Sequence, residues 1–501
     1  MRTTILGTAA LVALTASMAP AADFRIGLQE DPDILDPDQS RTFVGRIVYA
    51  SMCDKLVDIT PELEIIPSLA TGWSWNDDGT ELTMTLREDV VFHDGTPFNA
   101  EAVAANIDRS KNLETSRRKS EVKSIDSWEV VDEFTVKLTL SQPDATLIAQ
   151  FADRSGMMLS PTAFEAAGEE FGLAPVCAGP FAFVERVQQD RIVLEKFADY
   201  YRADEILLDS VTFLPIPDTT VRLANLRAGD LNMLERLAAT DVASVEGDDG
   251  LLLERATSLG YQGMTINVGN GERSENPLGQ SNLVRQALSL SVDRAALNQV
   301  VFEGAFAPGN QPFSPTSPWY NAEFQVPERD IDAAKALLGE AGFPDGVEIE
   351  VQVTNNPVQT QVMQVVQAMT AEAGITISLV AKEFATLLAD QSAGDYTASQ
   401  IGWSGRVDPD GNIHQFMTSG GGINDSKFSD PRMDELLDAA RLSTDPGVRK
   451  ESYDAAIALQ QEEMPIVYLY HPVWIWALDQ TVAGFTPYPD GMIRLHGVSV
   501  E

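Results

Sequence analysis

The sequence predicts an α/β protein with more than one domain. The chain has 501 residues, which is more than one compact core usually supports. Its 44% hydrophobic and 22% charged residues are typical of a soluble globular protein. Helix and strand periodicities alternate in the second half of the chain, as they do around a parallel sheet.

The N-terminus has the three-part layout of a secretory signal peptide. Arg2 supplies a positive charge, a short apolar run follows, and small residues around Ala21 and Ala22 precede the acidic Asp23. The run is too short to span a bilayer. We expect residues 1–22 to be removed on export. No cysteine follows the run to carry a lipid anchor, and no other stretch approaches the ~20 apolar residues of a membrane helix, so we expect no membrane insertion.

The net charge of −40 argues against two classes of partner. Such an excess of carboxylates repels nucleic acid and anionic membrane surfaces. Its simplest role is to keep the protein soluble. Net charge does not describe a binding pocket, however, where a few arginines can dominate.

The two cysteines, Cys53 and Cys177, predict one disulfide. An exported chain folds in an oxidising compartment, where an even number of cysteines is typical of structural bridges. We expect this bond to be a staple without a catalytic role.

The first part of the chain is rich in predicted strands. Apolar and polar residues alternate over 24–28, 82–86 and 136–140, with Asn-, Asp- and Gly-rich turns between them. A helix is predicted at 100–112, with Asn99 as its N-cap.

The second part reads as alternating helices and strands. A helix with a buried face is predicted from Leu283 to Val301. The elements predicted after it are helices at 331–341, 358–373 and 384–393, and strands at 347–353, 375–380 and 396–403. This alternation predicts a parallel sheet in a second domain with its own core. Two helices, at 431–441 and 445–463, and the apolar stretch 466–478 complete the chain.

No motif for catalysis, nucleotide binding or metal binding is present. The four histidines are scattered along the chain: His93, His414, His471 and His496. Gly402–Gly405 differs from a nucleophile elbow because its second glycine comes one residue early. The segment beginning at Asp408 lacks two required residues of a calcium loop, so we expect a turn there. We therefore predict no catalytic residue, no cofactor and no metal.

A candidate binding site lies at the end of the last strand of the alternating unit. Trp403 runs directly into Ser404, Gly405, Arg406 and, two residues later, Asp408. Ligands of open α/β sheets bind beyond the carboxyl ends of the strands. An aromatic face, a fork-shaped cation and a carboxylate suit a polar organic ligand. A surface turn with Trp403 packed in the core is the alternative.

Several sequence segments, taken together, carry a family resemblance. They are Pro67–Trp73, Val91-Phe-His-Asp-Gly-Thr-Pro-Phe-Asn-Ala-Glu-Ala-Val103, Cys177-Ala-Gly-Pro-Phe181, Val284-Arg-Gln-Ala-Leu288, Ala336–Gly342, and Gly402-Trp403 with Asp408-Pro409. With these segments in the expected order, the chain resembles the extracellular solute-binding proteins of family 5. These are the dipeptide-, oligopeptide- and nickel-binding components of ABC importers.

The resemblance implies a two-lobed periplasmic-binding-protein fold of type II, with an extra subdomain and a ligand cleft between the lobes. The first lobe would comprise 23–262 and 477–501, with an inserted subdomain at about 42–174, and the second lobe 263–476. The lobes would close on a ligand by hinge motion and present it to an ABC permease. The resemblance further implies a periplasmic protein that makes and breaks no bond, and we expect a monomer.

The resemblance leaves the ligand open. It implies further cleft contacts at Arg154, Met157 and Asn355, although a surface ion pair is an alternative for Arg154. Dipeptide binders of the family place an aspartate after the cleft tryptophan, where this chain has Arg406, unless Asp408 takes over that role. They also place an arginine near 353–355, where this chain has no cation.

We therefore expect a peptide or peptide-sized polar solute, with an opine, a saccharide or a nickel or other metal chelate as alternatives. If the ligand is anionic, we expect Arg406→Ala to weaken its binding. No constellation of residues in the sequence supports a secreted hydrolase. A sensory or chaperone-like role without transport is a further alternative.

Overall fold

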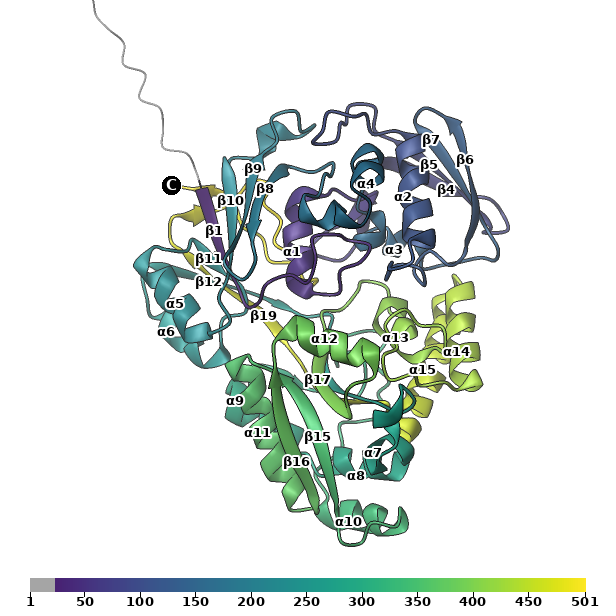
Figure 1. Ribbon diagram of the computed structural model, residues 1–501, viewed down its shortest axis with the longest axis vertical. Coiled ribbons are helices and arrows are strands. Elements are labelled where there is room, and N and C mark those ends of the chain that lie inside the picture. The colour runs from purple at the N-terminus through teal and green to yellow at the C-terminus, as the bar shows by residue number, and fades with distance from the viewer. Residues whose placement is uncertain (1–22) are drawn as a thin grey trace, which may run out of the picture.

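The computed structural model describes residues 23–501, so the signal-peptide prediction concerns residues outside this range. Two large sheets form the centres of two lobes, and a smaller four-stranded sheet lies beside the first (Figure 1). In the described part of the chain, no helix is long and apolar enough to cross a membrane.

The first lobe is built on a seven-stranded sheet in the order β12-β19-β11-β1-β10-β9-β8. Its strands are β1 (Asp23–Leu28), β8 (Phe181–Val187), β9 (Arg191–Lys196), β10 (Ser210–Pro215), β11 (Met233–Leu234), β12 (Leu251–Thr257) and β19 (Val473–Asp479). Helices α1 (Phe43–Met52), α5 (Thr219–Ala228) and α6 (Val242–Glu246) accompany it. β1 runs parallel to β10 and β11 at the centre of the sheet.

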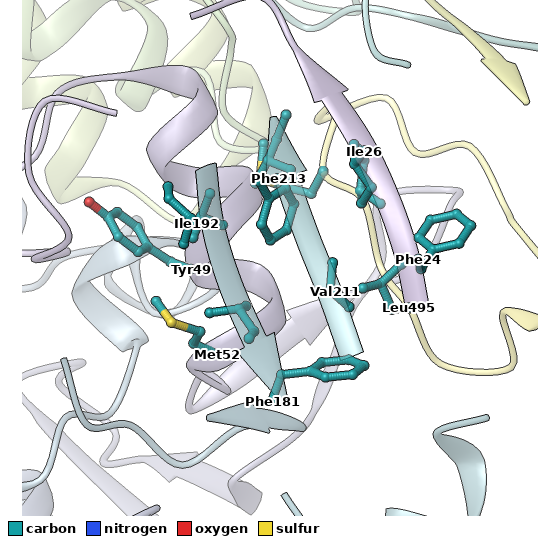
Figure 2. Packing of buried hydrophobic residues seen from close by; sticks show 14 of the residues in the cluster. Phe24, Ile26, Tyr49, Met52, Phe181, Ile192, Val211, Phe213 and Leu495 are labelled. Atoms are coloured by element: carbon teal, nitrogen blue, oxygen red, sulfur yellow. The ribbon is translucent and has the colours of Figure 1, made fainter. Parts of the chain in front are cut away.

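The predicted alternation of the first strand is confirmed by its packing. Phe24 and Ile26 are fully buried, and they lie near Val211 and Phe213 of β10 in the first core (Figure 2). Tyr49 of α1 belongs to the same core. This packing fixes β1, so the residues that follow its carboxyl end are held in place.

A disulfide joins Cys53, just after α1, to Cys177, as the sequence predicts. The two Cα atoms lie 4.9 Å apart, and both residues are buried in the first core. The bridge closes a loop that contains the whole smaller sheet.

The subdomain has its own core around the four-stranded sheet β4-β5-β7-β6. Its main elements are β4 (Ala70–Trp75), β5 (Glu81–Leu86), β6 (Ile125–Asp132), β7 (Thr135–Leu140), α2 (Ala100–Asn112), α3 (Leu147–Gln150) and α4 (Pro161–Ala167). Two further sheets, outside the three larger ones, have two strands each. In one, β2 (Val57–Ile59) pairs with β3 (Ile65–Pro67), and in the other, β20 (Val482–Ala483) pairs with β21 (Ser499–Val500). Because α1 packs in the first core, the separate core is smaller than the predicted 42–174.

The second lobe is built on a six-stranded sheet in the order β14-β18-β13-β17-β15-β16. Its strands are β13 (Tyr261–Ile266), β14 (Ala307–Pro308), β15 (Val347–Thr354), β16 (Ile375–Lys382), β17 (Ala398–Trp403) and β18 (Ile466–His471). Its helices are α7 (Pro277–Gln280), α8 (Asn282–Leu290), α9 (Arg294–Phe302), α10 (Ile331–Glu340), α11 (Pro357–Ala371), α12 (Phe384–Ala393), α13 (Asp410–Met417), α14 (Pro431–Leu442) and α15 (Pro446–Glu463).

Two details of the second lobe differ from the predictions. β15 is parallel to β16 and β17, as predicted, but β17 is antiparallel to β13, so the sheet is mixed. The single helix predicted over 283–301 is two helices, because Asp293 caps α9 by accepting from the Ala296 backbone N–H at 2.8 Å. Both helices bury apolar residues in the same core, which is why the spacing looked continuous.

The chain crosses between the lobes twice. It passes from β12 to β13 through residues 258–260, and from β18 to β19 at Pro472. The predicted boundary between residues 476 and 477 therefore falls inside β19, whose pairing with β12 places it in the first lobe. The Ser258 N–H donates to the Pro472 carbonyl at 3.2 Å, which ties the two crossings together.

Candidate functional site

An open cavity of about 900 Å³ lies between the lobes. From the first lobe, Gln29 and Glu30 line it just beyond the carboxyl end of β1. From the second lobe, Thr354 ends β15, and Trp403 ends β17. The cavity therefore occupies the place at which open α/β sheets bind ligands.

Aromatic rings form part of its wall: Phe43, Phe384, Trp403 and Phe416. The Trp403 indole N–H donates to Asn412 at 3.0 Å, and its ring meets Phe416 edge-on with centroids 4.9 Å apart. These contacts hold the indole in one orientation. Flat apolar faces of this kind stack on planar or aliphatic parts of a solute.

Side-chain amides form a second part of the wall: Gln29, Gln262, Asn356, Gln359 and Gln400. The Gln400 amide donates to Gln262 at 3.0 Å and to Gln359 at 2.7 Å, and the Tyr470 hydroxyl also donates to Gln359 at 3.2 Å. This network fixes neutral donors and acceptors in the wall of the cavity.

Four arginines line the cavity: Arg41, Arg118, Arg154 and Arg236. Glu30 is the one carboxylate among the lining residues. Arg41 pairs with Asp425, and the Arg236 Nε lies 3.4 Å from Glu235. Burial raises the pKa of Glu30 to about 8, against the opposing effect of Arg236. Burial, with the positive charge of Arg118, lowers the pKa of Arg154 to about 9.

Ion pairs and hydrogen bonds cross from lobe to lobe beside the cavity. Arg46 of the first lobe donates to the Ser404 hydroxyl of the second at 3.0 Å. Asp153 of the first lobe accepts from Arg46 at 2.9 Å and also pairs with Arg406 of the second lobe. Burial opposes ionisation of Asp153, but Arg406 and Arg46 together hold its pKa below the ordinary value. The lobes are therefore closed on each other.

Three of the predicted contact residues line the cavity: Trp403, Ser404 and Arg154. Their contact with a ligand stays a prediction. Two others, Gly405 and Arg406, are not part of the cavity lining. Gly405 has φ +88°, and a Cβ there would lie only 2.4 Å from Leu259. Arg406 turns away to Asp153, with its guanidinium 4.0 Å from the Trp403 ring centre.

The other three predicted contacts lie outside the cavity lining. Asp408 accepts from Arg449 at 2.6 Å and from the Asp410 N–H at 3.0 Å, so the predicted turn is confirmed. Met157 is buried in the first core. Asn355 is exposed, whereas Thr354 and Asn356 on either side of it line the cavity.

Sequence reasoning missed most of the polar wall. Gln29 and Glu30 follow a predicted strand, so the rule that pointed to Trp403 could have found them. Arg41 and Arg118 lie in irregular segments outside the predicted strands and helices, and only tertiary packing brings them to the cavity. No group of three or more metal-ligating side chains that could hold a metal ion occurs within residues 23–501.

The chain matches the family model described as bacterial extracellular solute-binding proteins, family 5, over residues 64–425. It is 28% identical to the glutathione-binding protein GsiB of Pectobacterium atrosepticum, covering 96% of this chain and 95% of that protein. GsiB of Escherichia coli O157:H7 is 29% identical, with 95% and 94% covered.

Two solved structures have the same fold over nearly the whole chain. The PBP AgaA of A. tumefaciens R10, in complex with agropinic acid, is 28% identical with a TM-score of 0.86, covering 96% of this chain and 99% of that one. A dipeptide-binding protein of Pseudoalteromonas sp. SM9913, in complex with Met-Leu, is 24% identical with a TM-score of 0.88, covering 96% and 100%. The predicted two-lobed periplasmic-binding-protein fold is confirmed.

Proposed function

Because the chain belongs to family 5 of the bacterial extracellular solute-binding proteins, we propose that it captures a peptide-sized polar solute between its lobes for an ABC importer. The observation that carries this proposal is the cavity between the lobes, walled from both sides by aromatic rings, amides and arginines. Such a wall surrounds a small polar compound and replaces its contacts with water.

The similar proteins narrow the size of the solute. GsiB is named for glutathione, and AgaA is bound to agropinic acid. Both are compact polar compounds that are smaller than a long peptide. We propose a solute of similar size for this chain, held by the aromatic, amide and arginine side chains that line the cavity.

The two crossings support closure as the binding step. Residues 258–260 and Pro472 are the two connections between the sheets, and they lie side by side. A rotation about them would open the cavity without disturbing either core. In this proposal the protein works in the periplasm as a monomer, releases its solute chemically unchanged, and hands it to the permease.

A thermal-shift screen of the mature protein tests the proposal. The screen would contain glutathione, agropinic acid, dipeptides, a nickel–histidine complex and simple saccharides. We expect one class to raise Tm, and native mass spectrometry to find that compound bound 1:1 and unaltered in mass. Failure of every class to bind, or conversion of the bound compound, would contradict the proposal.

A further inference from the structure

A group of buried arginines from both lobes adjoins the cavity. Its members are Arg46, Arg118 and Arg154 of the first lobe and Arg406 of the second, and each is at most 7% exposed. Arg118 and Arg154 also line the cavity itself. We call these four residues the arginine cluster.

The carboxylates bound to the arginine cluster do not balance its charge. Asp153 is shared by Arg46 and Arg406, and Glu121 pairs with Arg118. Two carboxylates thus face four guanidinium groups, which leaves two positive charges. Asp33, another carboxylate of the first lobe, accepts from the Ser40 hydroxyl and the Arg41 N–H, and no ion pair within the described residues joins it to the cluster.

Arg154 is the cation left without a carboxylate. Its Nη2 donates to the Thr42 carbonyl at 2.5 Å, and no carboxylate of residues 23–501 lies within ion-pair distance of it. The Nε atoms of Arg154 and Arg118 are both buried without a hydrogen-bond partner. Buried cationic donors without a partner are costly, so an anion in the cavity would stabilise this arrangement.

The rest of the cavity does not supply that anion. Glu30 is its one lining carboxylate, and burial raises the pKa of Glu30 to about 8, so this group is largely protonated at neutral pH. Asp425 pairs with Arg41, and Glu235 lies beside Arg236. Each of these two carboxylates is therefore offset by its own arginine and adds no net negative charge.

Resting on the proposed function, we infer that the solute is a carboxylic acid of net negative charge, whose carboxylate lies against Arg118 and Arg154. Guanidinium groups bind carboxylates in a bidentate geometry, which also orients the solute. Closure brings Arg406 into the arginine cluster and raises the positive charge of the cluster by one. A bound anion offsets that charge, so acidic solutes favour the closed state more than neutral ones do.

Titration calorimetry of the mature protein with acids and their amides tests this inference. The probes are glutathione and agropinic acid, each beside a derivative in which the carboxylates are amidated, together with a neutral dipeptide. We expect an acid to bind and its amide to bind at least about tenfold more weakly, which is ~1.4 kcal/mol. Equal binding of an acid and its amide would overturn the inference.

Variants assign the effect to the two cavity arginines. Arg154→Gln and, separately, Arg118→Gln should weaken binding of the acid by about 10- to 100-fold. They should leave binding of the amide nearly unchanged. The matched control is Arg191→Gln on β9, whose side chain is 41% exposed and is not part of the cavity lining. Thermal unfolding of each ligand-free variant confirms that it folds.

The outcomes separate the two claims. If neutral dipeptides bind as tightly as acids, or both variants retain full affinity for the acid, the inference fails while the proposed function stands. If no probe and no wider panel of solutes binds, both fail.

Discussion

At the scale of single residues, Arg406 holds the lobes together and does not touch the cavity. Its guanidinium pairs with Asp153 of the opposite lobe, and its backbone N–H donates to Asn412 at 2.7 Å. The expectation that Arg406→Ala removes a direct contact with the ligand is therefore replaced by a different one. We expect the substitution to act on closure.

A double-mutant cycle on Arg406→Gln and Asp153→Asn measures this cross-lobe pair. Either change alone should weaken solute affinity, because it leaves a buried partner unpaired in the closed state. The double variant should recover part of the loss, with a coupling of about 1–3 kcal/mol between the two positions. Additive effects in the calorimetric titration would show that the pair does not contribute to closure.

Two of the three predicted residues that line the cavity share one property. Trp403 and Ser404 stand at a strand end, and their place follows from the strand that precedes them. Arg154 was suggested by family resemblance. Arg406 could not be placed, because the direction of its side chain depends on Asp153 of the opposite lobe, which lies 253 positions earlier in the sequence.

At the scale of elements, the junction between β18 and β19 carries a buried histidine. His471 is 2% exposed, and its Nδ1–H donates to the Gly260 carbonyl of the other crossing at 2.8 Å. Its Nε2 is buried without a partner. Burial lowers the pKa of His471 to about 4, so the folded protein keeps this ring neutral.

Stability should therefore fall as the pH drops from about 6.5 to about 4. In that window the unfolded chain binds a proton at His471 that the folded chain does not, at a cost of up to about 3 kcal/mol. His471→Asn keeps a donor for Gly260 and removes the titration. Urea unfolding at several pH values should show a smaller loss on acidification for the variant, and identical pH profiles would contradict this account.

The disulfide is a second device at this scale. It spans 124 residues and ties the end of α1 to the segment before β8. Cys53→Ala with Cys177→Ala should lower the free energy of unfolding by about 3–5 kcal/mol, because the unfolded chain gains freedom. If the double variant has the same urea midpoint as the native protein, this expectation is contradicted. The control is the native protein measured with reductant.

Most elements were predictable because their apolar spacing is local. The failures occur where a break depends on a single residue within a continuous apolar pattern. Helix α8 ends at Leu290 and Asp293 caps the next helix, α9. Pro472 divides 466–478 into two strands that belong to different sheets. Apolar periodicity continues through both breaks, since the residues on either side are buried, and so it does not reveal them.

At the scale of the whole molecule, closure is distributed over several contacts. Beyond the arginine cluster, Arg41 pairs with Asp425, and the Ala145 N–H of the subdomain donates to the Arg441 carbonyl at 3.0 Å. Gly405 packs directly against residues 259 and 260 of the first crossing. The segment that follows Trp403 is thus in contact with the first crossing.

Small-angle X-ray scattering of the mature protein, with and without the solute that raises its Tm, tests the central claim most directly. A two-lobed protein that closes on its solute should show a smaller radius of gyration and a shorter maximum dimension when the solute is saturating. Arg406→Gln should need more solute to reach the same compact state. Identical scattering curves with and without bound solute would contradict capture by closure.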